Sequence, residues 1–167
     1  QWTLSAAKKS LKLDGVAVNT YAMSSELAFN EATQGEKGAQ LDGIGSMCHE
    51  FSHCLGLPDF YDTSGRNYPL FGMDYWDLMD YGCYNMDGYV PIAYSAYERD
   101  FMGWRKLQVL TGRGDYSMSA LEEGGVGYKI VNNANSNEYY ILENHNLLSY
   151  IYAYKKFGIV GDGNNQF

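Results

Sequence analysis

The segment CHEFSHCLGLPDFYD, residues 48–62, places two histidines four positions apart and then a glycine and an aspartate at regular intervals. On an α-helix, residues four positions apart differ by about 40° in azimuth and about 6 Å in height. His49 and His53 would therefore project side by side from one face. Two imidazoles in that arrangement can both reach one Zn²⁺ at about 2.0–2.1 Å. We expect a helix here, with the two rings as metal ligands.

A catalytic zinc site needs a third protein ligand and keeps its fourth position for water. Gly56 allows the chain to leave the helix in a conformation closed to residues with a β-carbon, and the turn that follows would return Asp59 to the metal. Asp59 is therefore the predicted third ligand. Two alternatives stay open: Asp62 in the same loop, and Glu98 on a second predicted helix.

Glu50 follows the first histidine directly. From that position a carboxylate can contact a metal-bound water without being a ligand itself, which is the arrangement of the general base in a metalloprotease. The simpler interpretation is that the histidines are ordinary core or surface residues. We favour the metal because the five specified positions of HExxHxxGxxD coincide in a chain with 3 histidines. On average residue usage such a match arises by chance in well under about one chain in a thousand.

The composition excludes several classes of protein. With 167 residues, 46% of them hydrophobic, the chain can bury one core but not two comfortable ones, so we expect a single domain over residues 1–167. There are 12 Lys and Arg against 20 Asp and Glu, and no basic run, so nucleic acid and anionic membranes are poor partners. No stretch approaches the roughly 20 apolar residues that span a bilayer, and the N-terminal residues lack a signal-peptide pattern.

The 3 cysteines are too few for a disulfide scaffold. Cys48 and Cys54 lie six positions apart on the predicted helix, which separates them by about 9 Å along its axis and turns them to different faces. They should therefore not bridge each other, and any disulfide must include Cys83.

The pattern around the histidines predicts a strand and then a helix. VAVNTYA, residues 16–22, alternates as a strand does, and the polar, glycine-containing segment after it is typical of a loop. The helix should run from about Ile44 to Leu55, with Asp42 or Ser46 as its N-cap.

The rest of the chain predicts a long loop, a second helix and three strands. Residues 59–90 show no sustained period, and their aromatic content favours a packed loop over disorder. Pro91 suits a first helical turn, and aromatic residues at helical spacing extend that helix to about Gly103. Three further segments have the pattern of strands, the last two joined as a hairpin: KLQVL, VGYKIVN and EYYILEN.

HExxHxxGxxD followed by a methionine turn resembles the metzincin clan of zinc peptidases with aspartate as third ligand. More closely, HEFSHCLGLPDFYD with WDLMDYG downstream is similar to the secreted immune inhibitor A family of metallopeptidases. The resemblance implies that His49, His53 and Asp59 are the zinc ligands. It also implies that Glu50 is the general base.

The resemblance gives roles to two residues of the turn. Met79 would be the methionine beneath the metal, where a thioether supplies an apolar floor. Tyr81 would occupy the place where some metzincins keep a tyrosine that can move toward the metal or the tetrahedral intermediate. In a chain with 16 tyrosines, an ordinary packing role for Tyr81 is an equally good interpretation. The strand at 16–22 would pair with extended substrate.

The implied fold class is α+β, a metzincin-like zinc peptidase catalytic domain. Residues 1–58 would supply the edge strand and active-site helix, and residues 59–167 the Met-turn loop, second helix and C-terminal strands. We expect a partial domain lacking the N-terminal strands and backing helix that normally precede the position matching Gln1 in this family. The residues after LENHN also depart from the family's usual continuation.

The predicted function is therefore that of a zinc-dependent endopeptidase that hydrolyses proteins or peptides through a metal-activated water and, by resemblance, is secreted. The alternative is a non-catalytic metal-stabilised or adhesive module derived from such a peptidase. Intact Glu50 favours the enzyme, because a structural zinc has no use for a base. The oligomeric state is not indicated.

A second metal is a further hypothesis. Four acidic residues crowd the predicted methionine turn and could bind Ca²⁺, which favours carboxylate-rich loops: Asp74, Asp77, Asp80 and Asp87. More often, such acids are solvated or accept hydrogen bonds from the loop backbone.

Overall fold

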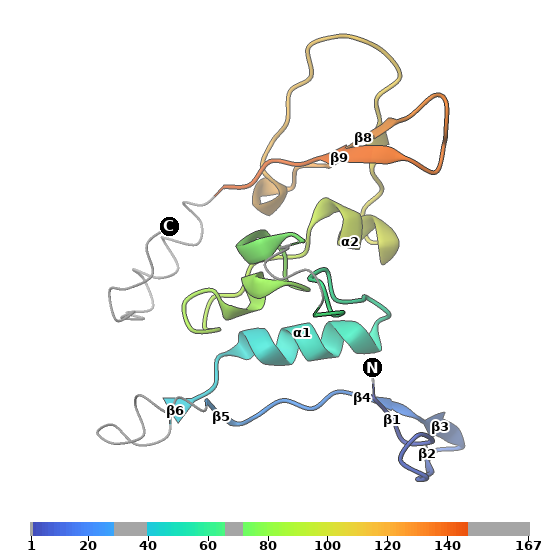
Figure 1. The fold of residues 1–167 in the computed structure, drawn as a ribbon, viewed down its shortest axis with the longest axis vertical. Coiled ribbons are helices and arrows are strands. Elements are labelled where there is room, and N and C mark those ends of the chain that lie inside the picture. The colour runs from blue at the N-terminus through green and yellow to red at the C-terminus, as the bar shows by residue number, and fades with distance from the viewer. Residues whose placement is uncertain (1, 29–39, 66–71, 147–167) are drawn as a thin grey trace. The chain divides into compact units, whose positions relative to one another are not determined.

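The computed structural model describes residues 2–28, 40–65 and 72–146 (Figure 1). Of the described residues, those up to Ile92 form one compact unit, unit 1, and those from Ala93 onward form a second, unit 2. Each unit is described by itself. Short strands, α-helices and 3₁₀ helices are mixed along the described residues, so the predicted α+β class is confirmed at that level.

The strands of unit 1 form short antiparallel pairs among the described residues: β1 (Trp2–Thr3) with β4 (Thr20–Tyr21), β2 (Leu11–Leu13) with β3 (Val16–Val18), and β5 (Leu27–Ala28) with β6 (Gln40–Leu41). A tight turn joins β2 to β3. Its central residues, Asp14 and Gly15, both have positive φ, 50° and 81°, as a type I′ hairpin turn requires.

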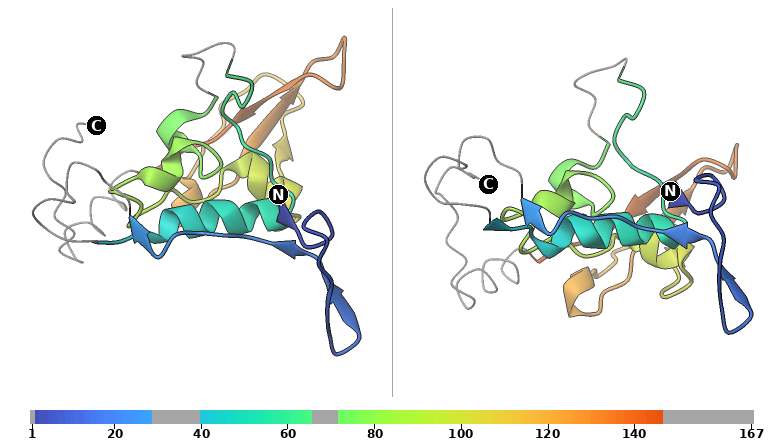
Figure 2. Two further views of the ribbon diagram at one scale, coloured as in Figure 1. Left: turned by 60° about the horizontal axis from the view of Figure 1, so that its bottom comes forward. Right: turned by 90° about the horizontal axis from the view of Figure 1, so that it is seen from below.

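The single strand predicted at 16–22 is divided in two, because its halves pair with different strands. Asn19 lies between β3 and β4. Its carbonyl accepts a hydrogen bond from the Leu4 N–H at 2.7 Å, and its side chain accepts one from the Ser5 N–H at 2.9 Å. Beyond β4, the chain runs alongside the histidine-bearing helix toward β5 in both views, and β4 contacts that helix (Figures 1 and 2).

Helix α1 (Ile44–Cys54) has the predicted bounds to within one residue. Both predicted N-caps are wrong, because the N-cap is Gly43 and no side chain caps the helix. A backbone carbonyl of a neighbouring loop instead accepts one of the free N–H groups at this helix end: the Gly45 N–H donates to the Gly88 carbonyl at 2.8 Å. The approach is so close that a β-carbon on Gly45 would lie 1.8 Å from the Cys83 carbonyl oxygen.

The C-terminal end of α1 is a Schellman motif. The Leu57 N–H donates to the Ser52 carbonyl at 3.2 Å, and the Gly56 N–H donates to the His53 carbonyl at 3.0 Å. Gly56 has a φ of 101°. The predicted exit from the helix at this glycine is confirmed.

The face of α1 that is buried in unit 1 carries small and polar residues, Gly45, His49 and Ser52. The large apolar side chains lie on another face and are 40–58% exposed: Ile44, Met47, Phe51 and Leu55. Hydrogen bonds to the backbone of other segments, from the Gly45 N–H to Gly88 and from His49 to Leu78, therefore contribute to the placement of this helix. The buried apolar residues of unit 1 come mostly from the loops that follow: Leu57, Leu78, Met79, Cys83 and Ile92.

The described part of the predicted long loop contains the 3₁₀ helices η1 (Asp74–Trp76) and η2 (Tyr81–Tyr84) and is otherwise irregular, as expected. The buried carboxylate of Asp80 stabilises this loop by accepting hydrogen bonds from its backbone. One carboxylate oxygen accepts hydrogen bonds from the N–H groups of Met73 and Asp74 at 2.7 and 2.8 Å, and the other accepts one from Tyr81 at 2.8 Å. Asp80 is 1% exposed.

Unit 2 contains α2 (Ala96–Phe101), η3 (Leu121–Glu123) and a sheet in the order β7 (Gln108–Val109), β8 (Tyr128–Val131) and β9 (Tyr139–Leu142). Strand β7 is parallel to β8, and β8 is antiparallel to β9. The predicted hairpin is confirmed.

Helix α2 is shorter than the predicted helix from Pro91 to Gly103. Ser95 and Glu98 form a capping box that starts it, with the Ser95 N–H donating to the Glu98 carboxylate at 2.6 Å. The aromatic residues at helical spacing do not form its buried face, since Phe101 is 52% exposed. The buried residues of α2 are Ala96 and Glu98.

A partly buried charge cluster links the residues that follow β9 to the rest of unit 2. His145 bonds through Nδ1 to Glu122 at 2.8 Å and through Nε2 to Glu143 at 3.0 Å. Glu143 also accepts from the Ala96 N–H at 2.6 Å. The hydrogen bond to Glu143, together with that to Glu122, outweighs burial and raises the pKa of His145 to about 9.

The three cysteines are free, so the expectation that Cys48 and Cys54 do not bridge each other is confirmed. Among the described residues, no helix is both long and apolar enough to cross a membrane.

We predict that Gly45→Ala destabilises unit 1. The added methyl group would collide with backbone, which should cost about 1–3 kcal/mol or more and outweigh the roughly 1 kcal/mol that alanine contributes to a helix. Denaturant unfolding of both proteins measures the difference. Met47→Ala on the exposed face is the control and should stay within about 0.5 kcal/mol of the parent. A stabilised Gly45→Ala protein would contradict the close approach.

We predict that His145 stays protonated well above neutral pH. Because its pKa is raised in the folded state to about 9, its stabilising contribution is complete below the ordinary value of 6.5 and is lost as pH rises through about 9. NMR titration of the His145 ring should give a midpoint near the raised value. A midpoint near 6.5 would show that the carboxylates do not hold the ring.

Candidate metal centre

The rings of His49 and His53 are both held through Nδ1 by backbone carbonyls. His49 Nδ1 lies 2.8 Å from the Leu78 oxygen, and His53 Nδ1 lies 2.8 Å from the Leu57 oxygen. A carbonyl oxygen can only accept a hydrogen bond, so each Nδ1 must carry the proton. In a neutral imidazole this leaves Nε2 with a free lone pair, the form in which histidine binds a metal.

Both Nε2 atoms face one oxygen of Asp59. The distances to Asp59 Oδ1 are 3.1 Å from His49 and 3.2 Å from His53. Ligand atoms of these three residues lie within 4.8 Å of one another. Tetrahedral zinc with bonds of about 2.0–2.1 Å separates its ligand atoms by roughly 3.3 Å, which agrees with the two measured distances.

The chemistry of this donor set favours positive charge at the point where the three groups meet. Two nitrogen lone pairs and a carboxylate oxygen repel one another when they are directed at one point, and the three side chains are only 11%, 13% and 24% exposed, so water screens them weakly. Either protons on both Nε2 atoms or one metal ion would remove the repulsion. The residues present therefore fit a metal with two nitrogen ligands and one oxygen ligand.

The segment around Met79 fixes the parts of this site that are distant in sequence. The Leu78 carbonyl accepts from His49, and the next carbonyl, that of Met79, accepts from the Phe60 N–H at 2.9 Å. One turn thus holds both the first ring and the loop that carries Asp59. The Met79 side chain is 0% exposed, and its role as an apolar floor beneath the metal stays a prediction.

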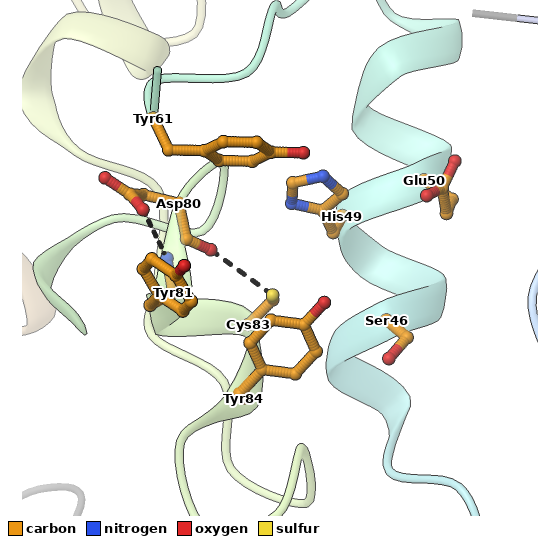
Figure 3. A pocket seen from close by; sticks show the side chains of 8 residues that line it. All are labelled: Ser46, His49, Glu50, Tyr61, Asp80, Tyr81, Cys83 and Tyr84. Atoms are coloured by element: carbon orange, nitrogen blue, oxygen red, sulfur yellow. Dashed lines mark hydrogen bonds between the residues drawn. The ribbon is translucent and has the colours of Figure 1, made fainter. Parts of the chain in front are cut away.

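An open cleft of about 290 Å³ borders His49 (Figure 3). It is lined by Ser46, His49, Glu50, Tyr61, Asp80, Tyr81, Cys83 and Tyr84. In the close view the His49 ring points toward the tyrosines, while Glu50 lies on the side of α1 away from them. The predicted base, Glu50, and the predicted tyrosine, Tyr81, are nevertheless both among the residues that line this cleft beside His49.

Tyr61 belongs to this site and was not singled out from the sequence. Its ring packs 6.4 Å from that of Tyr81, centroid to centroid. Burial and the nearby Asp59 carboxylate raise the pKa of Tyr61 to about 12, so its hydroxyl remains a hydrogen-bond donor at physiological pH. Its position two residues after Asp59, the predicted third ligand, is the sequence feature that could have indicated its place at the site.

The two alternative ligands have other contacts. Asp62 accepts a hydrogen bond from the Ser64 N–H at 2.8 Å and is not one of the clustered residues. Glu98 lies in unit 2 and belongs to the capping box of α2. Asp59 is thus the carboxylate that the structure brings to the two imidazoles.

Two of the four acidic residues considered for calcium, Asp77 and Asp80, accept hydrogen bonds from backbone. Both oxygens of Asp80 accept N–H groups, and Asp77 accepts from the Met79 N–H at 2.7 Å. This is the loop-stabilising role that was the alternative interpretation. A calcium site here stays a prediction.

Two imidazoles and a carboxylate in this arrangement, on a helix and the loop after it, are typical of a metal-dependent hydrolase. Comparison with known families agrees with this class: residues 4–108 match the catalytic domain of the immune inhibitor A peptidases, family M6. The match covers more than half of the chain, and the chain belongs to this family of metallopeptidases.

Curated relatives agree with this assignment. The pre-pro-metalloprotease PrtV of Vibrio cholerae serotype O1 is 36% identical over 67 residues, both in strain M66-2 and in strain ATCC 39315 / El Tor Inaba N16961. The aligned part is 37% of this chain and 7% of each relative, so the chain spans less than a tenth of their length. No solved structure matches the chain.

We predict that Asp59→Ala weakens zinc binding far more than Asp62→Ala. The first change removes the oxygen that both imidazoles face, so the loss should exceed the roughly 10–100-fold typical of residues that only support a ligand. The second removes a local hydrogen bond at an exposed turn. Competition with a chromophoric chelator measures both affinities. Equal affinities in the two variants would exclude Asp59 as the third ligand.

Proposed function

We propose that this chain carries the zinc site of a secreted, metzincin-like endopeptidase, with His49, His53 and Asp59 as zinc ligands. The observation that carries the proposal is the convergence of two Nδ1-anchored imidazoles on one carboxylate oxygen, at 3.1 and 3.2 Å. Family membership supports a metallopeptidase, and the nitrogen and oxygen donor set suits zinc.

The chemistry follows from the groups around this point. When bound, zinc would supply Lewis-acid polarisation of the scissile carbonyl and lower the pKa of a water molecule. Glu50 would take a proton from that water as its oxygen bonds to the carbonyl carbon. The same carboxyl group would return the proton to the leaving nitrogen as the C–N bond breaks. No covalent bond to the protein forms in this scheme.

The substrate would be an extended segment of protein or peptide. The chain from β4 to β5 runs alongside α1, and its backbone could pair with such a segment through main-chain hydrogen bonds (Figures 1 and 2). The cleft beside His49 would then receive a side chain of the substrate. Tyr81 borders it and would be placed to donate a hydrogen bond to the tetrahedral intermediate.

We predict that Glu50→Gln abolishes most hydrolysis without releasing zinc. Glutamine keeps the size of the side chain but cannot accept the proton, and loss of a general base typically costs about 10²–10⁴-fold in rate. The measurements are the rate of hydrolysis of a chemically unfolded, fluorescently labelled protein and the zinc content of the same samples. Glu123→Gln, an equal charge change at an exposed site of unit 2, should match the parent.

The outcomes separate the enzyme from the non-catalytic module. Hydrolysis by the parent and its loss in Glu50→Gln, with one zinc in each, supports the peptidase. One zinc with no hydrolysis in either protein would overturn the proposed activity of this chain and support a metal-stabilised module. A parent without zinc would overturn the metal site as well.

A further inference from the structure

We propose that Asp77 is a positioning residue that orients and polarises His49 through the peptide group between Leu78 and Met79. The inference rests on the proposed function, because it concerns a ligand of the proposed zinc site. Asp77 itself was considered from the sequence only as one acid of a calcium-binding loop. Its contacts in the structure give it a different role.

Three contacts form a continuous chain from the carboxylate to the metal centre. Asp77 Oδ1 accepts a hydrogen bond from the Met79 N–H at 2.7 Å. The Leu78 carbonyl accepts one from His49 Nδ1 at 2.8 Å. His49 Nε2 then faces Asp59 Oδ1 at 3.1 Å.

The first two contacts share one planar peptide group, because the Leu78 carbonyl and the Met79 N–H belong to the same amide. A carboxylate that accepts a hydrogen bond from the N–H increases the electron density on the carbonyl oxygen of the same amide. That oxygen then becomes a stronger acceptor for the ring proton. A stronger bond at Nδ1 makes Nε2 a better donor to a metal and fixes the direction of the ring. Asp77 therefore acts on the metal site without contacting it.

The surroundings of Asp77 favour this effect. The residue is 0% exposed, so the surrounding dielectric is low and its charge acts strongly on the neighbouring amide. Its own carbonyl accepts from the N–H groups of Asp80 and Gly82 at 3.2 and 3.0 Å. The backbone that carries the carboxylate is thus fixed directly before the peptide group that it polarises.

His53 is an internal comparison. Its Nδ1 donates to the Leu57 carbonyl, which belongs to the amide preceding Pro58. Proline has no N–H, so no carboxylate can polarise that amide in the same way. The two histidines have equal distances to their carbonyls but chemically different amides, and the proposed effect should appear in His49 alone.

The test is Asp77→Asn, with Asp80→Asn as the matched control. Both residues are buried acids of the same loop, and asparagine keeps an oxygen acceptor while removing the charge. Asp80 serves the N–H groups of Met73, Asp74 and Tyr81, none of which belongs to the amide bonded to His49. A change in the loop's stability alone should therefore appear in both variants.

NMR of the ring N–H protons in the metal-free protein is the first measurement. In Asp77→Asn, the His49 Nδ1–H resonance should move upfield, while that of His53 should stay in place. Zinc affinity, measured by chelator competition, should fall about tenfold, at the low end of the range for residues that support a ligand. In Asp80→Asn, which loses one of the two acceptor oxygens, any loosening of the loop should affect His49 and His53 alike, with no upfield shift confined to the His49 Nδ1–H resonance.

An unmoved His49 resonance in Asp77→Asn, or equal effects of the two variants on His49, would overturn the inference. Equal shifts of His49 and His53 would also overturn it, since they would indicate a general loosening of the site. A parent that fails to bind zinc overturns the proposed function instead. The metal-free NMR comparison still decides whether Asp77 acts on His49 in that case.

Discussion

Two successive carbonyls of the turn at Met79 hold the candidate metal centre together. The Leu78 carbonyl fixes the His49 ring, and the Met79 carbonyl holds the loop that carries Asp59. The helix and the turn are separated by more than twenty residues of sequence, yet these backbone contacts set the direction of the ligand atoms. A rotation of this turn would displace a nitrogen and an oxygen ligand together. The site therefore depends on the turn as much as on the helix that bears the histidines.

The same contacts explain why the three side chains remain close. Each Nδ1 donates its proton in a hydrogen bond to a backbone carbonyl. Both Nε2 atoms then face one carboxylate oxygen. Such an arrangement is unfavourable unless positive charge lies between the groups, and partial burial increases that penalty. The folded chain thus holds these groups close together despite their electrostatic repulsion, and a bound metal ion would offset that repulsion. This is the physical reason for regarding the arrangement as a metal centre and not as ordinary packing.

The sequence predicted the parts of this site that depend on local spacing. Histidines four residues apart, with Gly56 after them, were enough to predict α1, its exit and the approach of Asp59. It did not reveal the contacts made by backbone. Every residue has a backbone carbonyl, so the residue types do not show which carbonyls accept these hydrogen bonds. The N-terminal end of α1 was missed for the same reason: a glycine contact with the Gly88 carbonyl replaces the expected side-chain cap.

The errors in unit 2 have a different origin, since two sequence signals competed there. Proline and aromatic spacing favoured an early start for α2, whereas the capping box of Ser95 and Glu98 satisfies N–H groups directly and sets the observed start. The buried Glu98 is part of that box, and the cluster around His145 is likewise built within unit 2. Among the described residues, the contacts that position the candidate metal ligands lie in unit 1. The pH-dependent stability expected from His145 arises from contacts within unit 2.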